Sequence, residues 1–340
     1  MAKKIIVVPM MVMLVGCGVL FPAAPPSFPQ FAERSIAGPG SYQIPQWSPD
    51  SRSLAFIDRA PNLLVYDTQT QSTWTVATNV STAHYSWTPN GNLSYLKYRP
   101  NSTRLTDPVT LDLHQVDLNG ENDEIIAANL SDAKDFAWFG DGERLLILLT
   151  DPDSDTYYRD LYRLNTVTDT TDLLLKANDI GFQNILSLAL SSDEKSILVE
   201  GIHEDNGDYE AQIVIYDLEN QSILDKIIPG QIIPSGGINY PVPVTGDSTN
   251  FGWIGGQRWL LAKVNTPGGE CYNSALFFFD MRDLQNSFCI PTIAGIISDP
   301  TISPDLSKIT YITVAGVGQD YLMIGDVPPD LLTKLDLKSE

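Results

Sequence analysis

The chain has 340 residues, with 42 Asp plus Glu against 21 Lys plus Arg, and a formal net charge of -21 at pH 7. This length suffices for a large core, and closed all-β folds can reach it as a single domain. Such an acidic surface repels a phosphate backbone, which argues against nucleic acid as a partner and suits an exported, soluble body.

The first predicted element is an export signal. Two lysines precede an apolar run over residues 5–15. A membrane-spanning helix needs about 20 apolar residues, so this shorter run is typical of a signal peptide. The run ends in residues 14–17 (LVGC), which resemble the lipobox of bacterial lipoproteins. The resemblance implies removal of residues 1–16 and an extracytoplasmic protein anchored to a membrane at the cell envelope through a lipid on Cys17. The alternative is an ordinary secretory signal with a chance cysteine.

A proline-rich segment follows over residues 17–32. Its four closely spaced prolines oppose both a helix and a central strand. We interpret the segment as a semi-extended tether between the lipid and a folded domain over residues 33–340.

A turn motif recurs along this domain. Its first copy is Trp47-Ser48-Pro49-Asp50, and each copy is followed by an alternating apolar run. The later copies are residues 87–91 (WTPNG), 138–142 (WFGDG), 190–193 (LSSD), 253–256 (WIGG) and 302–305 (ISPD). Their spacings of 40 to 63 residues lie in the range of one propeller blade with loop insertions.

A second marker alternates with the first. After each run, another strand-like segment ends near an acidic or polar turn, as in residues 62–70 (NLLVYDTQT) and 212–220 (QIVIYDLEN). A further apolar segment follows most of these, as in residues 72–77 (STWTVA). Each unit therefore offers four strands, which can pack radially with only short exposed edges.

The six units together resemble the TolB-like β-propellers, whose WD40-like repeat carries a tryptophan and a Ser-Pro-Asp-Gly turn. The resemblance covers about residues 35–328 and weakens in the fourth and fifth units, where Leu190 replaces the tryptophan and no Pro-Asp follows Ile254. It implies an all-β, six-bladed propeller with four antiparallel strands in each blade. Residues 34–37 look like the strand that completes the last blade, and residues 331–337 compete for that place.

The turn residues have a structural interpretation. Proline fixes φ at the first central position, Asp or Ser can bond nearby amides, and the tryptophan packs between blades. Six equivalent copies indicate a structural role in each blade, because a catalytic site needs one asymmetric group of residues. The residues assigned to this role are Trp47, Pro49, Asp50, Trp87, Pro89, Trp138, Asp141, Trp253, Pro304 and Asp305.

Signs of catalysis are few. The three histidines, His84, His114 and His203, lie far apart in sequence and are expected in different blades, which disfavours a histidine metal site in the channel. No HExxH, paired CxxC, GxSxG or glycine-rich phosphate loop occurs. We therefore expect no cofactor, and we favour a binding function over an enzymatic one.

Two acidic connections are the most suggestive local features. Asp151, Asp153 and Asp155 alternate as in calcium loops, but Thr156 and Tyr162 stand where an EF-hand needs glycine and glutamate. Calcium binding there is thus the alternative to a solvated acidic loop. The fourth unit has an equivalent acidic loop at residues 203–210, and a long connection spans residues 229–250. The residues expected on a shared ligand- or partner-binding face are Asp153, Asp155, Tyr157, Tyr158, His203, Asp205, Tyr209 and Tyr240.

Cys271 and Cys289 remain once Cys17 is assigned. An oxidising compartment favours a disulfide between them, which would close a loop of about 19 residues and contribute roughly 3 kcal/mol. The alternative is a pair of buried thiols.

Two functions remain open. The first is a monomeric binding or scaffold module for an envelope protein or cell-wall component. The second is a carbohydrate-active enzyme or glycan-binding propeller. Hydrolysis would need two carboxylates about 5 to 10 Å apart at the channel mouth.

Overall fold

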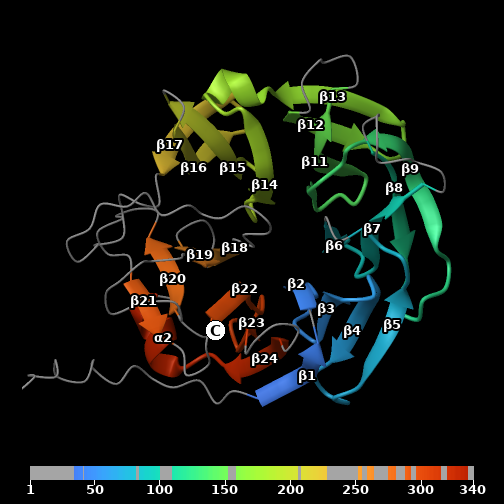
Figure 1. Cartoon of the computed structure of the whole chain (residues 1–340), viewed down its shortest axis with the longest axis vertical. Coiled ribbons are helices and arrows are strands. Elements are labelled where there is room, and N and C mark those ends of the chain that lie inside the picture. Colours follow the sequence, from blue (N-terminus) through green and yellow to red (C-terminus); the bar gives the residue numbers. More distant parts are fainter. Residues whose placement is uncertain are drawn as a thin grey trace, which may run out of the picture.

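The structure is a computed structural model that describes residues 34–40, 42–81, 84–99, 109–151, 158–205, 208–227, 252–254, 259–263, 275–280, 288–291, 296–314 and 320–335. Within these ranges the strands form six four-stranded antiparallel sheets. Figure 1 shows the sheets arranged around a common centre, with strands such as β2, β6, β14 and β22 innermost. The chain is an all-β propeller with four antiparallel strands in each blade, as the repeat predicts.

Five of the described sheets use four consecutive strands each, and we number them 1 to 5 in chain order. Sheet 1 contains β2 (Tyr42–Trp47), β3 (Ser53–Asp58), β4 (Leu63–Asp67) and β5 (Thr73–Ala77). Sheet 2 contains β6 (Tyr85–Trp87), β7 (Leu93–Tyr98), β8 (Thr110–Val116) and β9 (Glu124–Ser131). Sheet 3 contains β10 (Phe136–Trp138), β11 (Arg144–Thr150), β12 (Arg159–Asn165) and β13 (Thr170–Leu175).

Sheets 4 and 5 continue this order. Sheet 4 contains β14 (Asn184–Leu190), β15 (Ser196–Asp205), β16 (Asp208–Asp217) and β17 (Ser222–Ile227). Sheet 5 contains β18 (Gly252–Ile254), β19 (Trp259–Lys263), β20 (Ala275–Asp280) and β21 (Phe288–Pro291).

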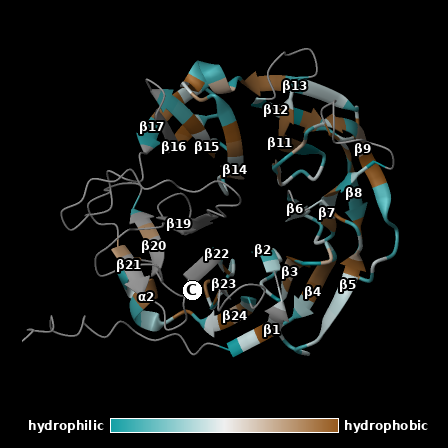
Figure 2. Cartoon of the chain, viewed as in Figure 1, coloured by the Kyte–Doolittle hydropathy of each residue, from teal (hydrophilic) through white to brown (hydrophobic). Residues whose placement is uncertain are grey.

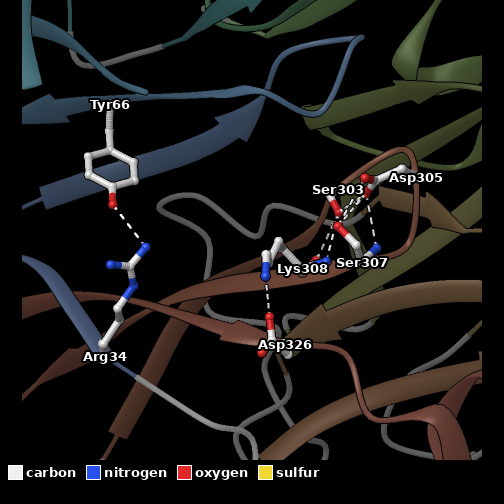
Figure 3. A network of polar contacts seen from close by, with 7 residues as sticks. All are labelled: Arg34, Tyr66, Ser303, Asp305, Ser307, Lys308 and Asp326. Carbon is white, nitrogen blue, oxygen red and sulfur yellow. Dashed lines mark hydrogen bonds and ion pairs between the residues drawn. The ribbon is translucent and has the colours of Figure 1, made fainter. Parts of the chain in front are cut away.

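The remaining sheet, which we call the closing sheet, joins the two ends of the chain. It contains β22 (Ile296–Ile302), β23 (Lys308–Val314), β24 (Asp320–Asp326) and β1 (Arg34–Gly40). β1 pairs antiparallel with β24, which confirms that the N-terminal strand completes the last unit. The Arg34 side chain also donates to the Tyr66 hydroxyl in sheet 1 at 3.1 Å (Figure 3).

The competing candidate for that place was residues 331–337, and its described part, residues 331–335, does not form a strand. The short helix α2 (Pro329–Lys334) begins with proline in its first turn, where the missing amide costs nothing. Leu331 and Leu335 are buried in a cluster with Phe278, so the helix covers part of the closing sheet and sheet 5. A 3-10 turn, η1 (Ala177–Ile180), leads into sheet 4. Among the described residues, no helix is long and apolar enough to cross a membrane.

The core lies between neighbouring sheets. Apolar residues concentrate along the strands (Figure 2). Described clusters lie between sheets 1 and 2, 2 and 3, and 3 and 4, and on both faces of the closing sheet, against sheets 5 and 1. Trp47 clusters with Ile312 and Leu322 of the closing sheet. The indole of Trp87 donates to the Gln46 carbonyl at 3.1 Å, joining sheet 2 to sheet 1. Tryptophans of the turn motif thus lie between blades, as the repeat suggests.

The turn carboxylates cap their own turns. Asp50 accepts from the Ser48 hydroxyl at 2.6 Å and from the Arg52 amide at 3.1 Å. Asp305 makes the equivalent bonds with Ser303 and Ser307 (Figure 3). Each carboxylate therefore satisfies a polar turn that would otherwise leave donors unpaired.

One sequence expectation about loops is wrong. Residues 203–210 were expected to form a loop, but β15 and β16 run for ten residues each and pair as far as Asp205↔Asp208. Pairing with β14 stops at Ile202, and pairing with β17 stops at Ile213. We call residues 203–210 the extended hairpin, because this ladder projects beyond both neighbouring strands.

Candidate functional site on the inner strands

Polar residues recur at one position of the inner strands, three residues before the first residue of the turn motif. The position holds His84 in sheet 2, Asp135 in sheet 3, Ser187 in sheet 4 and Asp299 in the closing sheet. Asp135 and Asp299 are buried, at 5% exposure each. Because inner strands surround the centre of a propeller, these residues lie at the inner edges of their sheets.

His84 and Asp135 form a pair across two sheets. The His84 Nδ1 atom lies 3.0 Å from Asp135 Oδ1, and the two side chains are 14% and 8% exposed. The Phe136 ring packs edge-on against the imidazole, with centroids 5.2 Å apart. Burial and this ring contact fix the orientation of the imidazole toward its carboxylate.

Asp135 extends the contact to a third sheet. Its Oδ1 accepts from the Phe136 amide at 2.8 Å, and its Oδ2 accepts from the Leu188 amide of β14 at 2.8 Å. Each of its two oxygens therefore accepts one backbone N–H bond. Asp135 therefore joins sheets 2, 3 and 4 through one buried side chain.

Gln46 continues the chain of contacts in the other direction. Its amide nitrogen donates to the Tyr85 carbonyl at 2.9 Å and lies 3.4 Å from His84 Nε2. Gln46, His84 and Asp135 thus form a polar belt, which we define by these three residues, from sheet 1 to the edge of sheet 4.

Tyr85, the residue after His84, connects the polar belt to β2 and β3. Its hydroxyl is fully buried, donates to the Ile44 carbonyl and lies 2.6 Å from the Ala55 carbonyl. Burial, with a smaller contribution from Asp299, raises the pKa of Tyr85 well above its usual value, so the group stays a donor. Ile44 has φ of 53°, a conformation that costs a β-branched residue energy.

A second polar group lies where β12 begins, beside the predicted acidic loop. Arg159 pairs with Asp132 at 2.5 Å, and its amide donates to Asn184 Oδ1 at 2.9 Å. Burial first, then Asp151 and Asp160, raise the pKa of Tyr162 to about 12. The Asn184 contact ties the beginning of β12 to sheet 4.

The base of the extended hairpin is anchored by the connection from sheet 3. His203 Nδ1 lies 2.6 Å from the Gly181 carbonyl, and the Gln183 side chain donates to Glu204. Phe182 packs against Gly201, where an added Cβ would lie 2.1 Å from the ring. The base of the extended hairpin is therefore held by residues 181–183 of the connection between sheets 3 and 4.

The structure places only part of the sequence-predicted binding face. Tyr158 is exposed, and His203 lies in β15. Asp205 and Tyr209 lie in the extended hairpin, but their side chains are outside the described part of the structure, as are Asp153, Asp155, Tyr157 and Tyr240. Cys17 and Cys271 are also outside it, and Cys289 lies in β21 without a described side chain.

The expectation that the three histidines occupy different blades is wrong. His84 precedes β6 and His114 lies in β8, so both belong to sheet 2. They make separate contacts, because His114 Nδ1 lies 2.9 Å from Asp123 rather than near His84. Among the described residues, no group of three or more His, Cys, Asp or Glu is placed to hold a metal ion.

Sequence reasoning missed Gln46 and Asp135. The signal that reveals Asp135 is its place in the repeat, since the position that carries His84 in sheet 2 carries Asp135 in sheet 3. Gln46 carries no such signal, because it stands one residue before the turn motif rather than three.

Among known proteins, only solved structures resemble this chain, and they do so in fold. No family profile matches the chain, and no curated protein matches its sequence. A gluconolactonase from Xanthomonas campestris aligns with a TM-score of 0.54 at 14% identity, over 86% of this chain and 89% of its own. An oligogalacturonate lyase from Vibrio parahaemolyticus aligns with a TM-score of 0.51 at 12% identity, over 84% of this chain and 77% of its own.

TolB from Acinetobacter baumannii is a further structural neighbour. It aligns with a TM-score of 0.48 at 17% identity, over 84% of this chain and 63% of its own. The likeness is one of fold. At such low identities, neither the sugar-related enzymes nor TolB lends its activity to this chain.

Proposed function

We propose that this chain is a lipid-anchored β-propeller that binds a partner protein at the cell envelope and performs no catalysis. In this proposal the sheets are the six blades of one closed, monomeric ring with the plan of the TolB-like propellers. The observation that carries it is the contrast between the two faces of the ring. One face repeats from sheet to sheet, and the other differs.

The repeating face carries the turn motifs, and its carboxylates are engaged in construction. Asp50, Asp193 and Asp305 each accept from a hydroxyl two residues earlier in their own turn. Neighbouring turns also bond to each other, as the Asp305 amide donates to Ser51 Oγ at 2.9 Å. This face suits assembly of the ring.

The opposite face carries the connections that differ, and loops on a rigid scaffold are common sites of binding. It holds the loop before β12, where Tyr158 is exposed, and the extended hairpin. His203 and Glu204 anchor the base of the hairpin. A pre-positioned hairpin loses little conformational entropy on binding.

Charge indicates the kind of partner. The extended hairpin has four acidic residues in eight, at positions 204, 205, 208 and 210, within a chain of net charge -21. A partner surface rich in Lys and Arg would be attracted and correctly oriented by this field. We therefore expect association that weakens as salt is added.

Site-specific photo-crosslinking in intact cells tests this function. A photoreactive residue at Tyr158 or Asp205 probes the variable face, and one at Gln69 or Asn119, both in exposed turns, probes the repeating face. We expect one shared crosslinked protein from the first pair, with a yield that falls in Glu204→Lys. The proposal fails if both faces give the same products, or if the first pair gives none.

The anchor has its own test. Residues 14–17 (LVGC) support lipidation at Cys17, and the tether over residues 17–32 would hold the ring away from the membrane. Labelled fatty acid should enter the wild-type chain and a Cys289→Ser control but not Cys17→Ser. Label retained in Cys17→Ser would contradict the anchor without affecting the binding proposal.

Carbohydrate binding or turnover is the second candidate function. The His84–Asp135 pair favours it, because a histidine oriented by a carboxylate is a common general base. A glycan array and a panel of oligosaccharide substrates should give signals that disappear in Asp135→Asn if this candidate is correct. Signals that persist in a folded Asp135→Asn protein would remove it.

A further inference from the structure

We propose that His84 is a proton-operated link at the inner edges of the sheets: the neutral imidazole holds the Gln46 amide of sheet 1, and a proton at Nε2 displaces it. The inference is independent of the partner proposed above. It rests on the hydrogen-bond directions available to the three residues of the polar belt.

The Tyr85 carbonyl fixes the orientation of the Gln46 amide. A carbonyl only accepts, so the group 2.9 Å away must be the Gln46 nitrogen. That nitrogen has a second hydrogen, and His84 Nε2 lies 3.4 Å from it. Nε2 must therefore act as an acceptor in this arrangement, which is long for a hydrogen bond but correctly matched.

Asp135 fixes the other side of the imidazole. Its Oδ1 lies 3.0 Å from His84 Nδ1, and a carboxylate requires a donor there. The geometry thus assigns neutral His84 the tautomer with hydrogen on Nδ1 and a lone pair on Nε2. Both ring nitrogens are matched to their neighbours only in this form.

Protonation of Nε2 turns the acceptor that faces the Gln46 amide into a donor. Two donors, the imidazolium N–H and the Gln46 N–H, would then face each other. If the amide flipped, its oxygen would accept from His84 but would lie against the Tyr85 carbonyl, which is also an acceptor. Proton uptake therefore costs one of the two Gln46 contacts, while the charged imidazolium attracts Asp135 more strongly.

Two carboxylates lie near the neighbouring residues His84 and Tyr85. Asp135 faces His84 from sheet 3, and Asp299 of the closing sheet is close enough to act on the neighbouring Tyr85 hydroxyl. Asp135 pairs with the His84 ring at Nδ1, and the Tyr85 hydroxyl stays neutral. Gln46 opposes the imidazolium, so the link shifts from sheets 1 and 2 toward sheets 2 and 3 when the proton binds.

The shift matters because β6 holds β2 at few points. Gln46 bonds to the Tyr85 carbonyl, Trp87 bonds to the Gln46 carbonyl, and the Tyr85 hydroxyl bonds to Ile44. One of these three contacts involves the Gln46 side chain. A proton at His84 thus costs the Gln46 side chain either its His84 contact or its Tyr85 contact, and so weakens the hold on the inner strand of sheet 1.

Nitrogen NMR of the full-length chain tests the link. His114→Asn and His203→Asn variants identify the His84 ring signals by elimination, and Gln46→Leu identifies the Gln46 side-chain amide. At neutral pH we expect a protonated Nδ1 and a bare Nε2. On acidification the Nε2 signal and the Gln46 amide pair should move together. A neutral ring with hydrogen on Nε2, or Gln46 signals unaffected by the His84 titration, overturns the proposal.

A matched pair of variants supplies the second readout. Gln46→Glu places an acceptor opposite Nε2, so the His84 titration should move to higher pH than in the wild type. Gln69→Glu adds the same charge in an exposed turn and should leave it unchanged. Equal titrations in both variants count against the proposal. If Gln46→Glu does not fold, Gln46→Leu removes the opposing donor and should also shift the titration upward.

Discussion

The hydroxyl of Tyr85 in β6 donates to the carbonyl of Ile44 in β2, a buried residue with φ of 53°. The bond links sheet 2 to the irregular part of sheet 1, where the pairing of β2 with β3 shifts between Gln43 and Gln46. Ile44 therefore keeps an unfavourable backbone conformation because the neighbouring sheet satisfies its carbonyl.

This relationship predicts the effect of Tyr85→Phe. The change removes a buried donor from the Ile44 carbonyl and leaves an orphaned acceptor, so the free energy of unfolding should fall by about 1–3 kcal/mol. Urea unfolding of Tyr85→Phe and of Tyr158→Phe, at an exposed position, measures the difference. Equal stability of the two variants would show that the bond contributes nothing.

Gly201→Ala should destabilise the base of the extended hairpin. The new Cβ would lie 2.1 Å from the Phe182 ring, which is buried at 1% exposure and has little room to move. We expect a loss of about 1–3 kcal/mol in the free energy of unfolding, the usual cost of overpacking. Gly201→Ala combined with Phe182→Leu should recover part of the loss, and no recovery would argue against a local clash.

Removing β1 should open the ring. A chain that begins at Tyr42 lacks the partner of β24, while a control chain that begins at Arg34 keeps it. We expect the shorter chain to unfold at a Tm lower by about 5 °C or more and to self-associate through the exposed edge of β24. Calorimetry and light scattering measure these effects, and identical behaviour would mean that another segment closes the ring.

Acid should destabilise the turns. Bonds from the Ser48 hydroxyl and the Arg52 amide lower the pKa of Asp50, and the Asn220 amide and side chain lower the pKa of Asp217. A folded pKa below the unfolded value, about 3.9, means that this stabilisation is complete above that value and is lost as pH falls through the folded pKa.

The test replaces these carboxylates with a non-titrating acceptor. The Asp50→Asn/Asp217→Asn protein should lose less stability than the wild type between neutral pH and the pH range below about 4. The control Asp169→Asn, at another exposed turn position, should follow the wild-type curve. Chemical unfolding at several pH values measures both, and parallel curves for all three proteins would contradict the prediction.

The repeat made the architecture predictable. Trp47, Trp87 and Trp138 mark inner strands because each unit must bury the same large side chain against its neighbour. The pairing of β1 with β24 was also predictable, since residues 34–37 form a strand with no place in the first unit. These features depend on local pattern and on closure of a ring, both of which are visible in one sequence.

The polar belt was not predictable in the same way. Gln46 and Asp135 are 89 positions apart, and only the ring brings them to either side of His84. The extended hairpin was misread because its acidic residues are typical of a loop, although His203 and Glu210 pair as strand neighbours. In both cases backbone pairing across the fold decided the outcome over local composition.

Closure by β1 has a mechanical consequence for a protein held at its N-terminus. If the chain is held through residues 17–32, as proposed above, a pull on that segment would reach Arg34 first and would load the β1–β24 ladder before any other sheet. The hydrogen bonds of this ladder would then break first under load. The Arg34–Tyr66 bond lies at the end of the ladder that is loaded first. Traction on the tether would therefore part the two chain ends at this joint, while sheets 1 to 5 stay intact.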